Sequence, residues 1–270
     1  MGVRVIYDRI IDAARDVGYR IRDGWDWARD TTWKSRILAT GVLVAVCAVV
    51  AAVIGGPDEG ESTNDKALTD VLVVQARSDL PSTTWSGWTQ RPVTEQPTVA
   101  SPAEGITAQP TDCVPGGAAQ QRAQKPSVSG NAWVGTEFTN PVLAARATVM
   151  IARNDVDVAA GIDGWLATCA HAVATEGAVR AAVDVRAIGI DARTYRLDMA
   201  RLVAQSVTPE IANAGPAKTG LTAIGRSGAY VLTVMMAFPG PVTDEMISVL
   251  DTLWRAQSAK LVGYRQAGKL

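Results

Sequence analysis

Two of the three cysteines in this chain of 270 residues could form a covalent bond with each other. Cys47 lies inside a long apolar run and is interpreted as a small apolar side chain. Cys113 and Cys169 remain, and an oxidising compartment favours a disulfide between them over the alternative of two unpaired buried thiols. A disulfide closing a loop of this length contributes roughly 4 kcal/mol in the chain-entropy description. The sequence therefore predicts a Cys113–Cys169 disulfide.

Side chains suited to acid–base or nucleophilic catalysis are few. His171 is the only histidine, and its expected place on the outer side of a helix favours an exposed or capping role. The nearest approach to a nucleophile elbow is GRSGA at residues 225–229, which lacks the last glycine of that motif and is interpreted as a turn before a strand. Two acidic pairs suit the first turns of helices, namely Asp155 with Asp157 and Asp244 with Glu245. Because no GxGxxG, P-loop or HExxH pattern occurs, we expect no catalytic residues, with a hydrolase as the alternative.

The composition excludes further classes of protein. The formal net charge is -1 and the pI is about 5.9, so the chain as a whole has no electrostatic attraction to nucleic acid. Clustered pairs of cysteine and histidine are missing, so the usual zinc frameworks cannot form. An apolar fraction of 47% suits one medium domain with appendages or two small domains. We expect no metal, no cofactor and no nucleic-acid partner.

Four tryptophans are candidates for recognising a ligand: Trp85, Trp88, Trp133 and Trp165. An indole ring offers a large apolar surface with one polar group, which suits a binding site. The alternative is that these rings fill the core of a domain that has only two phenylalanines. Both interpretations stay open for each residue.

A membrane anchor is predicted before the domain that carries these residues. Residues 37–54, ILATGVLVAVCAVVAAVI, contain no charge, amide or proline, and two glycines extend the run to residue 56. At about 1.5 Å per residue, a helix of this length covers the roughly 30 Å hydrocarbon core of a bilayer. The alternatives are a buried helix of a soluble protein and a cleaved signal peptide, but signal peptides seldom carry so long a leading segment. The sequence predicts an uncleaved transmembrane signal anchor over residues 37–56.

The charges around the span predict its orientation. Residues 1–36 hold eight Lys or Arg, of which Lys34 and Arg36 lie nearest the bilayer, whereas acidic residues come first after the span. The positive-inside rule therefore predicts a cytosolic N-terminus and an extracytoplasmic segment over residues 57–270. Apolar residues recur at helical spacing in the tail, which predicts an amphipathic helix that contacts the membrane or a partner helix. Three tail tryptophans suit the membrane interface: Trp25, Trp27 and Trp33.

The segment beyond the membrane is predicted to hold a polar linker at 57–66 and one α+β domain at 67–270. Residues 81–126 carry seven of the thirteen prolines and are expected to be mostly loop around a folded core. Alternating or continuous apolar patterns predict strands at 144–153, 178–188, 194–203 and 230–238. Apolar periods of three and four predict helices at 159–173 and 246–261. We expect an antiparallel sheet with helices packed on one face.

A set of short motifs runs through this domain. They are Thr111-Asp112-Cys113, Ala132-Trp133, the strand around Val149, the acidic Asp155 to Asp157, Gly164 to Ala170 with its Trp-x3-Cys spacing, and Gly228 to Leu232. Together they resemble the PknH-like extracellular sensor domain, a family found behind a single span in actinobacterial receptor kinases and in envelope lipoproteins. The resemblance covers roughly residues 67–263 and implies an antiparallel sheet, packed helices and a ligand cleft. The chain departs from the family because no second cysteine pair follows Cys169, and it carries no kinase motifs.

Two functions follow from this organisation. The first is a single-pass sensor or binding protein of the cell envelope, whose partners are the lipid bilayer and a small envelope ligand or another envelope protein. The second is a structural subunit of a secretion, conjugation or division machine, because such subunits share the same topology. An apolar pocket with a few polar groups would favour the first, and a flat apolar patch with a stable oligomer would favour the second.

Overall fold

The computed structural model describes residues 66–75, 79–94, 105–128, 132–211 and 216–270. The predicted tail, the predicted span and the linker up to residue 65 lie outside these ranges. So do the predicted membrane-interface residues Trp25, Trp27, Trp33, Lys34 and Arg36. No helix within the described ranges is long and apolar enough to cross a membrane. Membrane anchoring therefore stays a prediction from the sequence.

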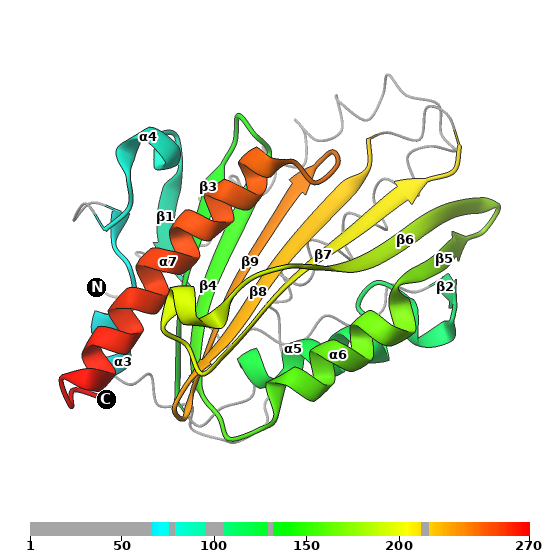
Figure 1. Cartoon of the computed structure of the whole chain (residues 1–270). Helices are drawn as coiled ribbons and strands as arrows, with labels where there is room; N and C mark the ends of the chain where they lie inside the picture. The colour runs from blue at the N-terminus through cyan, green and yellow to red at the C-terminus, as the bar shows by residue number, and fades with distance from the viewer. Residues whose placement is uncertain (1–65, 76–78, 95–104, 129–131, 212–215) are drawn as a thin grey trace, which may run out of the picture.

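The strands of the described ranges form a single antiparallel sheet of nine (Figure 1). The strands are β1 (Thr89–Pro92), β2 (Ile106–Gln109), β3 (Trp133–Asn140), β4 (Ala145–Arg153), β5 (His171–Glu176), β6 (Val179–Ile188), β7 (Met199–Pro209), β8 (Lys218–Ser227) and β9 (Tyr230–Pro239). Their order across the sheet is β1-β3-β4-β9-β8-β7-β6-β5-β2. The edge strands β1 and β2 have four residues each, so each edge exposes only a short row of unpaired backbone groups.

The helices pack on both faces of the sheet. They are α3 (Lys66–Val71), α4 (Ser82–Trp85), α5 (Ala118–Val128), α6 (Val158–Cys169) and α7 (Asp244–Gln266), with short 3-10 turns η2 (Thr111–Cys113) and η3 (Ala192–Tyr195). In β9, Leu232 and Val234 belong to the hydrophobic cluster of α7, whereas Val231 belongs to the cluster of α5 and α6. Successive strand residues point to opposite faces, so the two clusters lie on opposite sides of the sheet.

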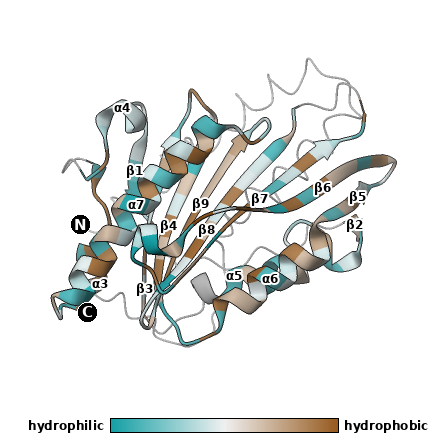
Figure 2. Cartoon of the chain, in the orientation of Figure 1, coloured by the Kyte–Doolittle hydropathy of each residue, from teal (hydrophilic) through white to brown (hydrophobic). Residues whose placement is uncertain are grey.

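The prediction that helices cover one face is therefore wrong, while the predicted α+β class with an antiparallel sheet is confirmed. The run YVLTVMMAF in β9 is apolar on both sides because both sides are buried. Figure 2 shows brown and teal bands alternating along α7, which packs its apolar side on the sheet and leaves a polar side outward.

The α5–α6 pair packs with close backbone contact. A Cβ atom added at Gly161 of α6 would lie 2.7 Å from the backbone oxygen of Arg122 in α5. The predicted disulfide is present beside this pair, where Cys113 of η2 is bonded to Cys169, the last residue of α6. Both cysteines are buried. The bond fixes the segment before α5 to the end of α6.

Several boundaries differ from those predicted. The supposed loop at 81–126 contains α4, β1, β2, η2 and the start of α5, whose sequence AAQQRAQKPSV is too polar to give an apolar stripe. The helix predicted over 159–173 ends at Cys169, and β5 begins at His171. The strand predicted from residue 194 begins at Met199, and β8 was not predicted. The strands predicted at 144–153, 178–188 and 230–238 and the final helix are confirmed with shifts of a few residues, whereas β3 was not among the predicted strands.

The final helix α7 holds the first described segment of the chain by hydrogen bonds. The fully buried side chain of Gln257 accepts from the Val73 backbone N–H at 3.0 Å and donates to the Val71 carbonyl at 2.7 Å. One turn on, the Lys260 ammonium donates to the Leu72 carbonyl at 2.6 Å and to Asp79 at 3.1 Å. These contacts satisfy backbone groups that the end of α3 would otherwise leave unpaired.

A second polar contact joins α7 to the β6–β7 connection. The Tyr195 hydroxyl donates to the Asp251 carboxylate at 2.5 Å, and its ring stacks on Trp254 with centroids 4.3 Å apart. Arg255 pairs with the same carboxylate at 2.6 Å. Burial of the phenol, followed by its hydrogen bond to the Asp251 carboxylate, raises the pKa of Tyr195 to about 12. The protonated phenol is therefore stabilised by folding.

This raised pKa predicts a loss of stability in strong alkali. Because the folded pKa of Tyr195 lies above the value of 10 in the unfolded chain, its stabilisation is complete below about pH 10 and is lost as the pH rises through about 12. We expect Tyr195→Phe to destabilise the protein by about 1 kcal/mol at neutral pH, through the lost hydrogen bond. The difference in melting temperature between variant and wild type should shrink between pH 10 and 12. A difference that stays constant over that range would contradict this role.

Candidate functional site

The four tryptophans predicted to bind a ligand are buried in three separate hydrophobic clusters. Trp85 and Trp88 lie in the α7 cluster with ring centroids 4.7 Å apart. Trp165 lies in the α5–α6 cluster, and Trp133 lies in a small third cluster with Met150. None of the four lines either cavity described below. These positions agree with the core-filling alternative, and ligand contact by these tryptophans stays a prediction.

The residues considered for catalysis are not brought together. His171 is the first residue of β5 rather than part of a helix, its side chain is 88% exposed, and its Nδ1 lies 2.8 Å from the Asp184 carboxylate on β6. Ser227 ends β8 and is fully buried, and its Oγ has no hydrogen-bond partner among the described residues. Residues Gly228 and Ala229 form the predicted turn before β9. Asp157 caps the N-terminus of α6, as its position in an acidic pair suggested.

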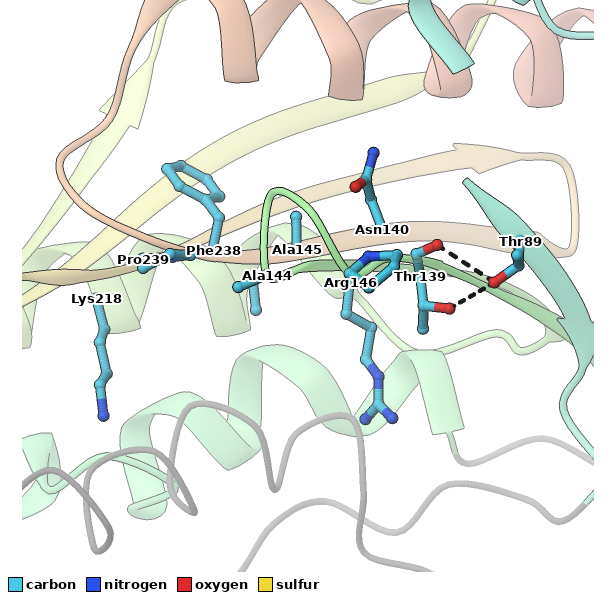
Figure 3. A pocket seen from close by; sticks show the side chains of 11 residues that line it. Thr89, Thr139, Asn140, Ala144, Ala145, Arg146, Lys218, Phe238 and Pro239 are labelled. Atoms are coloured by element: carbon cyan, nitrogen blue, oxygen red, sulfur yellow. Dashed lines mark hydrogen bonds between the residues drawn. The ribbon is translucent and has the colours of Figure 1, made fainter. Parts of the chain in front are cut away.

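A cavity of about 440 Å³ opens at the end of the sheet where β3 turns into β4 (Figure 3). Its volume falls within the roughly 300–1,000 Å³ typical of small-molecule sites. The residues that line it come from β1, β3, β4, β8, β9 and the β3–β4 turn: Thr89, Thr139, Asn140, Pro141, Ala144, Ala145, Arg146, Lys218, Ala237, Phe238 and Pro239. Most of these side chains are apolar or small. The site is therefore built from rigid strands, with one turn at its rim.

Strand register places small residues between two basic side chains. Arg146 of β4 lies opposite Ala237 of β9, and Ala237 lies opposite Gly220 of β8. Lys218 lies two residues before Gly220, so it is on the same face. A Cβ atom added at Gly220 would meet no atom within 4 Å, so the sheet surface beside Ala237 is open. Figure 3 shows the Arg146 and Lys218 side chains extending to one side of the sheet, and those of Phe238 and Asn140 to the other.

Two basic side chains, Arg146 and Lys218, line the cavity, and a buried carboxylate lies beside it. Glu137, whose side chain is only 6% exposed, lies between Arg91 at 2.5 Å and Arg146 at 3.1 Å. No aspartate or glutamate is among the described residues that line the cavity. The Glu137 carboxylate is therefore matched by two guanidinium groups.

The β3–β4 turn at the rim presents apolar side chains to solvent. The Asn140 side-chain oxygen accepts from the backbone N–H groups of Val142 and Leu143, both at 3.1 Å. The turn closes through Ala144, whose φ of 48° is in the left-handed region that disfavours residues with a Cβ. Val142 is 89% exposed and Leu143 is 44% exposed. The turn thus holds two hydrophobic side chains outward beside the cavity mouth.

No family model matches this sequence, and no curated protein matches it. Two solved structures are similar at low identity. The extracellular domain of PknH from Mycobacterium tuberculosis is 11% identical with a TM-score of 0.44, over 74% of this chain and 100% of that chain. The uncharacterized Rv0999 ortholog from Mycobacterium smegmatis is 16% identical with a TM-score of 0.35, over 68% of this chain and 93% of that chain. Scores of this size do not establish family membership, so the resemblance noted in the sequence stays a prediction.

A second cavity, of about 530 Å³, lies between the α3 segment and β1. Its polar side chains already serve the fold. Gln75 donates to the Trp85 and Trp88 carbonyls, and Gln90 donates to the Val73 carbonyl and the Thr136 hydroxyl. Among the described residues, no group of three or more His, Cys, Asp or Glu could hold a metal ion. The first cavity is therefore the better candidate.

Sequence patterns did not identify this site, although one signal was available. The segment Pro141-Val142-Leu143 is an apolar run at a position that turn residues normally make polar, and such a run marks an exposed contact surface. Arg146 and Lys218 are 72 positions apart and reach the same cavity only through the order β4-β9-β8. That order is a long-range property of the sheet.

Proposed function

We propose that this chain is a single-pass, membrane-anchored binding or sensor protein of the cell envelope. Its outer domain binds a small envelope ligand in the cavity beside the β3–β4 turn. The observation that carries the proposal is the cavity itself, whose described lining combines apolar walls with the two basic side chains of Arg146 and Lys218. The proposed role is binding without catalysis.

Two further features support the extracytoplasmic location. The Cys113–Cys169 disulfide is of a kind that persists in oxidising compartments and is rare in the cytosol. The charges around residues 37–56 favour a cytosolic N-terminus by the positive-inside rule. The resemblance of the sequence to the PknH-like sensor family, in which the sensor lies outside the membrane, is in line with this placement.

The proposal is tested by filling the cavity. Ala237→Trp places an indole between Arg146 and Lys218, and we expect the full-length variant to reach the membrane fraction but to lose its ligand. Small molecules retained by the purified protein are compared by mass spectrometry. The matched control is Ala187→Trp, on an exposed position of β6 away from the cavity. If wild type, Ala237→Trp and Ala187→Trp retain equal amounts of ligand, this cavity is not the binding site.

A structural subunit is the second candidate, because the exposed turn residues Val142 and Leu143 also suit a protein contact. Chemical crosslinking in native membranes separates the two functions. A stable oligomer that is dissolved by Val142→Ser with Leu143→Ser would favour the subunit. A protein that is monomeric and keeps its ligand, both as wild type and as the double serine variant, would favour the binding protein.

A further inference from the structure

We propose that the cavity takes a single uncharged hydrocarbon chain, such as the chain of a fatty alcohol or of an isoprenoid alcohol. This inference rests on the proposed binding function and names the chemical class of its ligand. The chain would lie over Ala237, between the aliphatic stems of the Arg146 and Lys218 side chains.

The charged ends of the two basic side chains already have partners. The Arg146 guanidinium lies 3.1 Å from the buried carboxylate of Glu137, and Lys218 also has an interaction partner within the protein. Both side chains extend to the same side of the sheet (Figure 3), yet most of the surface that the cavity presents is apolar. Long basic side chains often cover apolar surface with their methylene groups while the charge is satisfied elsewhere. We therefore assign the stems of these side chains, and not their charges, to the ligand.

The other polar groups of the described lining offer few hydrogen bonds to a ligand. Thr89 Oγ1 and Thr139 Oγ1 are 2.8 Å apart, so these two hydroxyl groups bond to each other. The Asn140 side-chain oxygen accepts from the backbone of the β3–β4 turn. A sugar or a peptide bound here would bury polar groups without partners, and each such group would weaken binding.

The width of the site suits one chain. Arg146 and Lys218 belong to β4 and β8, which are separated by β9 and therefore lie two strand spacings apart, or roughly 10 Å. The floor between them is low, because β9 presents Ala237 there and its partner on β8 is Gly220. Carbon atoms in contact are about 4 Å apart, so one hydrocarbon chain fits between the two stems and two chains side by side do not.

The test uses the full-length chain held in an amphipathic polymer, with tritiated hexadecanol as the probe and scintillation proximity as the readout. Unlabelled hexadecanol, farnesol, palmitate, a hexadecyl ammonium salt and dipalmitoylglycerol compete for the probe. We expect hexadecanol or farnesol to compete best, and whichever is stronger identifies a straight or a methyl-branched chain. The two ions should compete less well, because each brings a charge to an apolar surface whose own charges are already paired. The diacylglycerol should compete poorly because it has two chains.

Two substitutions at Lys218 separate its stem from its charge. Lys218→Met keeps an unbranched side chain without the charge, so the affinity for hexadecanol should stay within about twofold of wild type. Lys218→Ala removes the stem, and the affinity should fall at least about fourfold, which corresponds to one buried methylene group. The same two substitutions at Lys269, which is exposed near the C-terminus, are the control and should change nothing. Thermal unfolding of each variant checks that the fold is kept.

Each outcome decides a different statement. If Lys218→Met weakens binding as much as Lys218→Ala, or if palmitate competes as well as hexadecanol, the assignment of an uncharged ligand is wrong. If dipalmitoylglycerol competes as well as hexadecanol, the single chain is wrong.

The variant that fills the cavity tests the location. If wild type binds no more hexadecanol than Ala237→Trp does, no hydrocarbon chain binds in this cavity and the proposed ligand class is overturned. The ligand content of Ala237→Trp in mass spectrometry would still test the proposed binding function by itself.

Discussion

Replacing Gln257 with leucine is expected to lower the free energy of unfolding by roughly 2–6 kcal/mol. The leucine side chain has similar volume but cannot pair with the Val73 N–H or the Val71 carbonyl, which Gln257 satisfies in a fully buried position. A buried backbone group without a partner costs about 1–3 kcal/mol, and two are left here. The same change removes two of the hydrogen bonds that hold residues 66–75 against α7, while the Lys260 bond to the Leu72 carbonyl stays.

Hydrogen–deuterium exchange of the full-length protein measures both effects. Peptides covering residues 66–75 should exchange much faster in Gln257→Leu, while peptides from β9 should change only as far as global stability falls. Gln266→Leu is the matched control, since Gln266 is on the same helix and is exposed. Unchanged protection of residues 66–75 in Gln257→Leu would show that α3 is held by other contacts.

Removing the disulfide should have a comparable effect. The bond joins residues 56 positions apart, and closing a loop of that size contributes about 4 kcal/mol in the chain-entropy description. We expect Cys113→Ala with Cys169→Ala to lower stability by roughly 2–5 kcal/mol and to loosen α6 and η2 first. The measurement is thermal unfolding with limited proteolysis between η2 and α6.

Reductant provides the comparison for this variant. Wild-type protein treated with dithiothreitol should approach the melting temperature of the double alanine variant, and the variant itself should not respond to reductant. A reductant effect in the variant would place the sensitivity at Cys47, the third cysteine. An equal melting temperature for wild type and variant would show that the bond does not stabilise the fold.

The patterns that predicted the fold were those generated by local periodicity. The strand at 144–153 was found from its run of β-favouring residues, which include Val149 and Ile151, and the final helix from the helical period of its apolar residues. Helix α5 was missed because it packs through small residues such as Ala119 and Ala123, which leave no strong apolar stripe. Short helices of this kind take their stability from tertiary contact, which no local pattern records.

The disulfide could be predicted because only Cys113 and Cys169 lie outside the apolar run that contains Cys47. The cavity could not be predicted from the sequence. Its two basic residues lie on β4 and β8, which are far apart in sequence and are brought near each other by β9, the strand between them in the sheet. Tryptophans attracted attention in the sequence because they are large, but Trp85, Trp133 and Trp165 are buried where size serves packing. The candidate site instead depends on small residues such as Ala237, whose value is the space they leave.

Helix α7 separates the cavity from the point where the described chain begins. Its N-terminal end follows β9 at the cavity end of the sheet, and its C-terminal half binds α3, where the described chain begins (Figure 1). The helix has 23 residues, which corresponds to about 34 Å. If the chain is tethered just before α3, the cavity stands off from its own tether by about the thickness of a bilayer core. A ligand bound in the cavity would then lie on the side of the domain away from the tether.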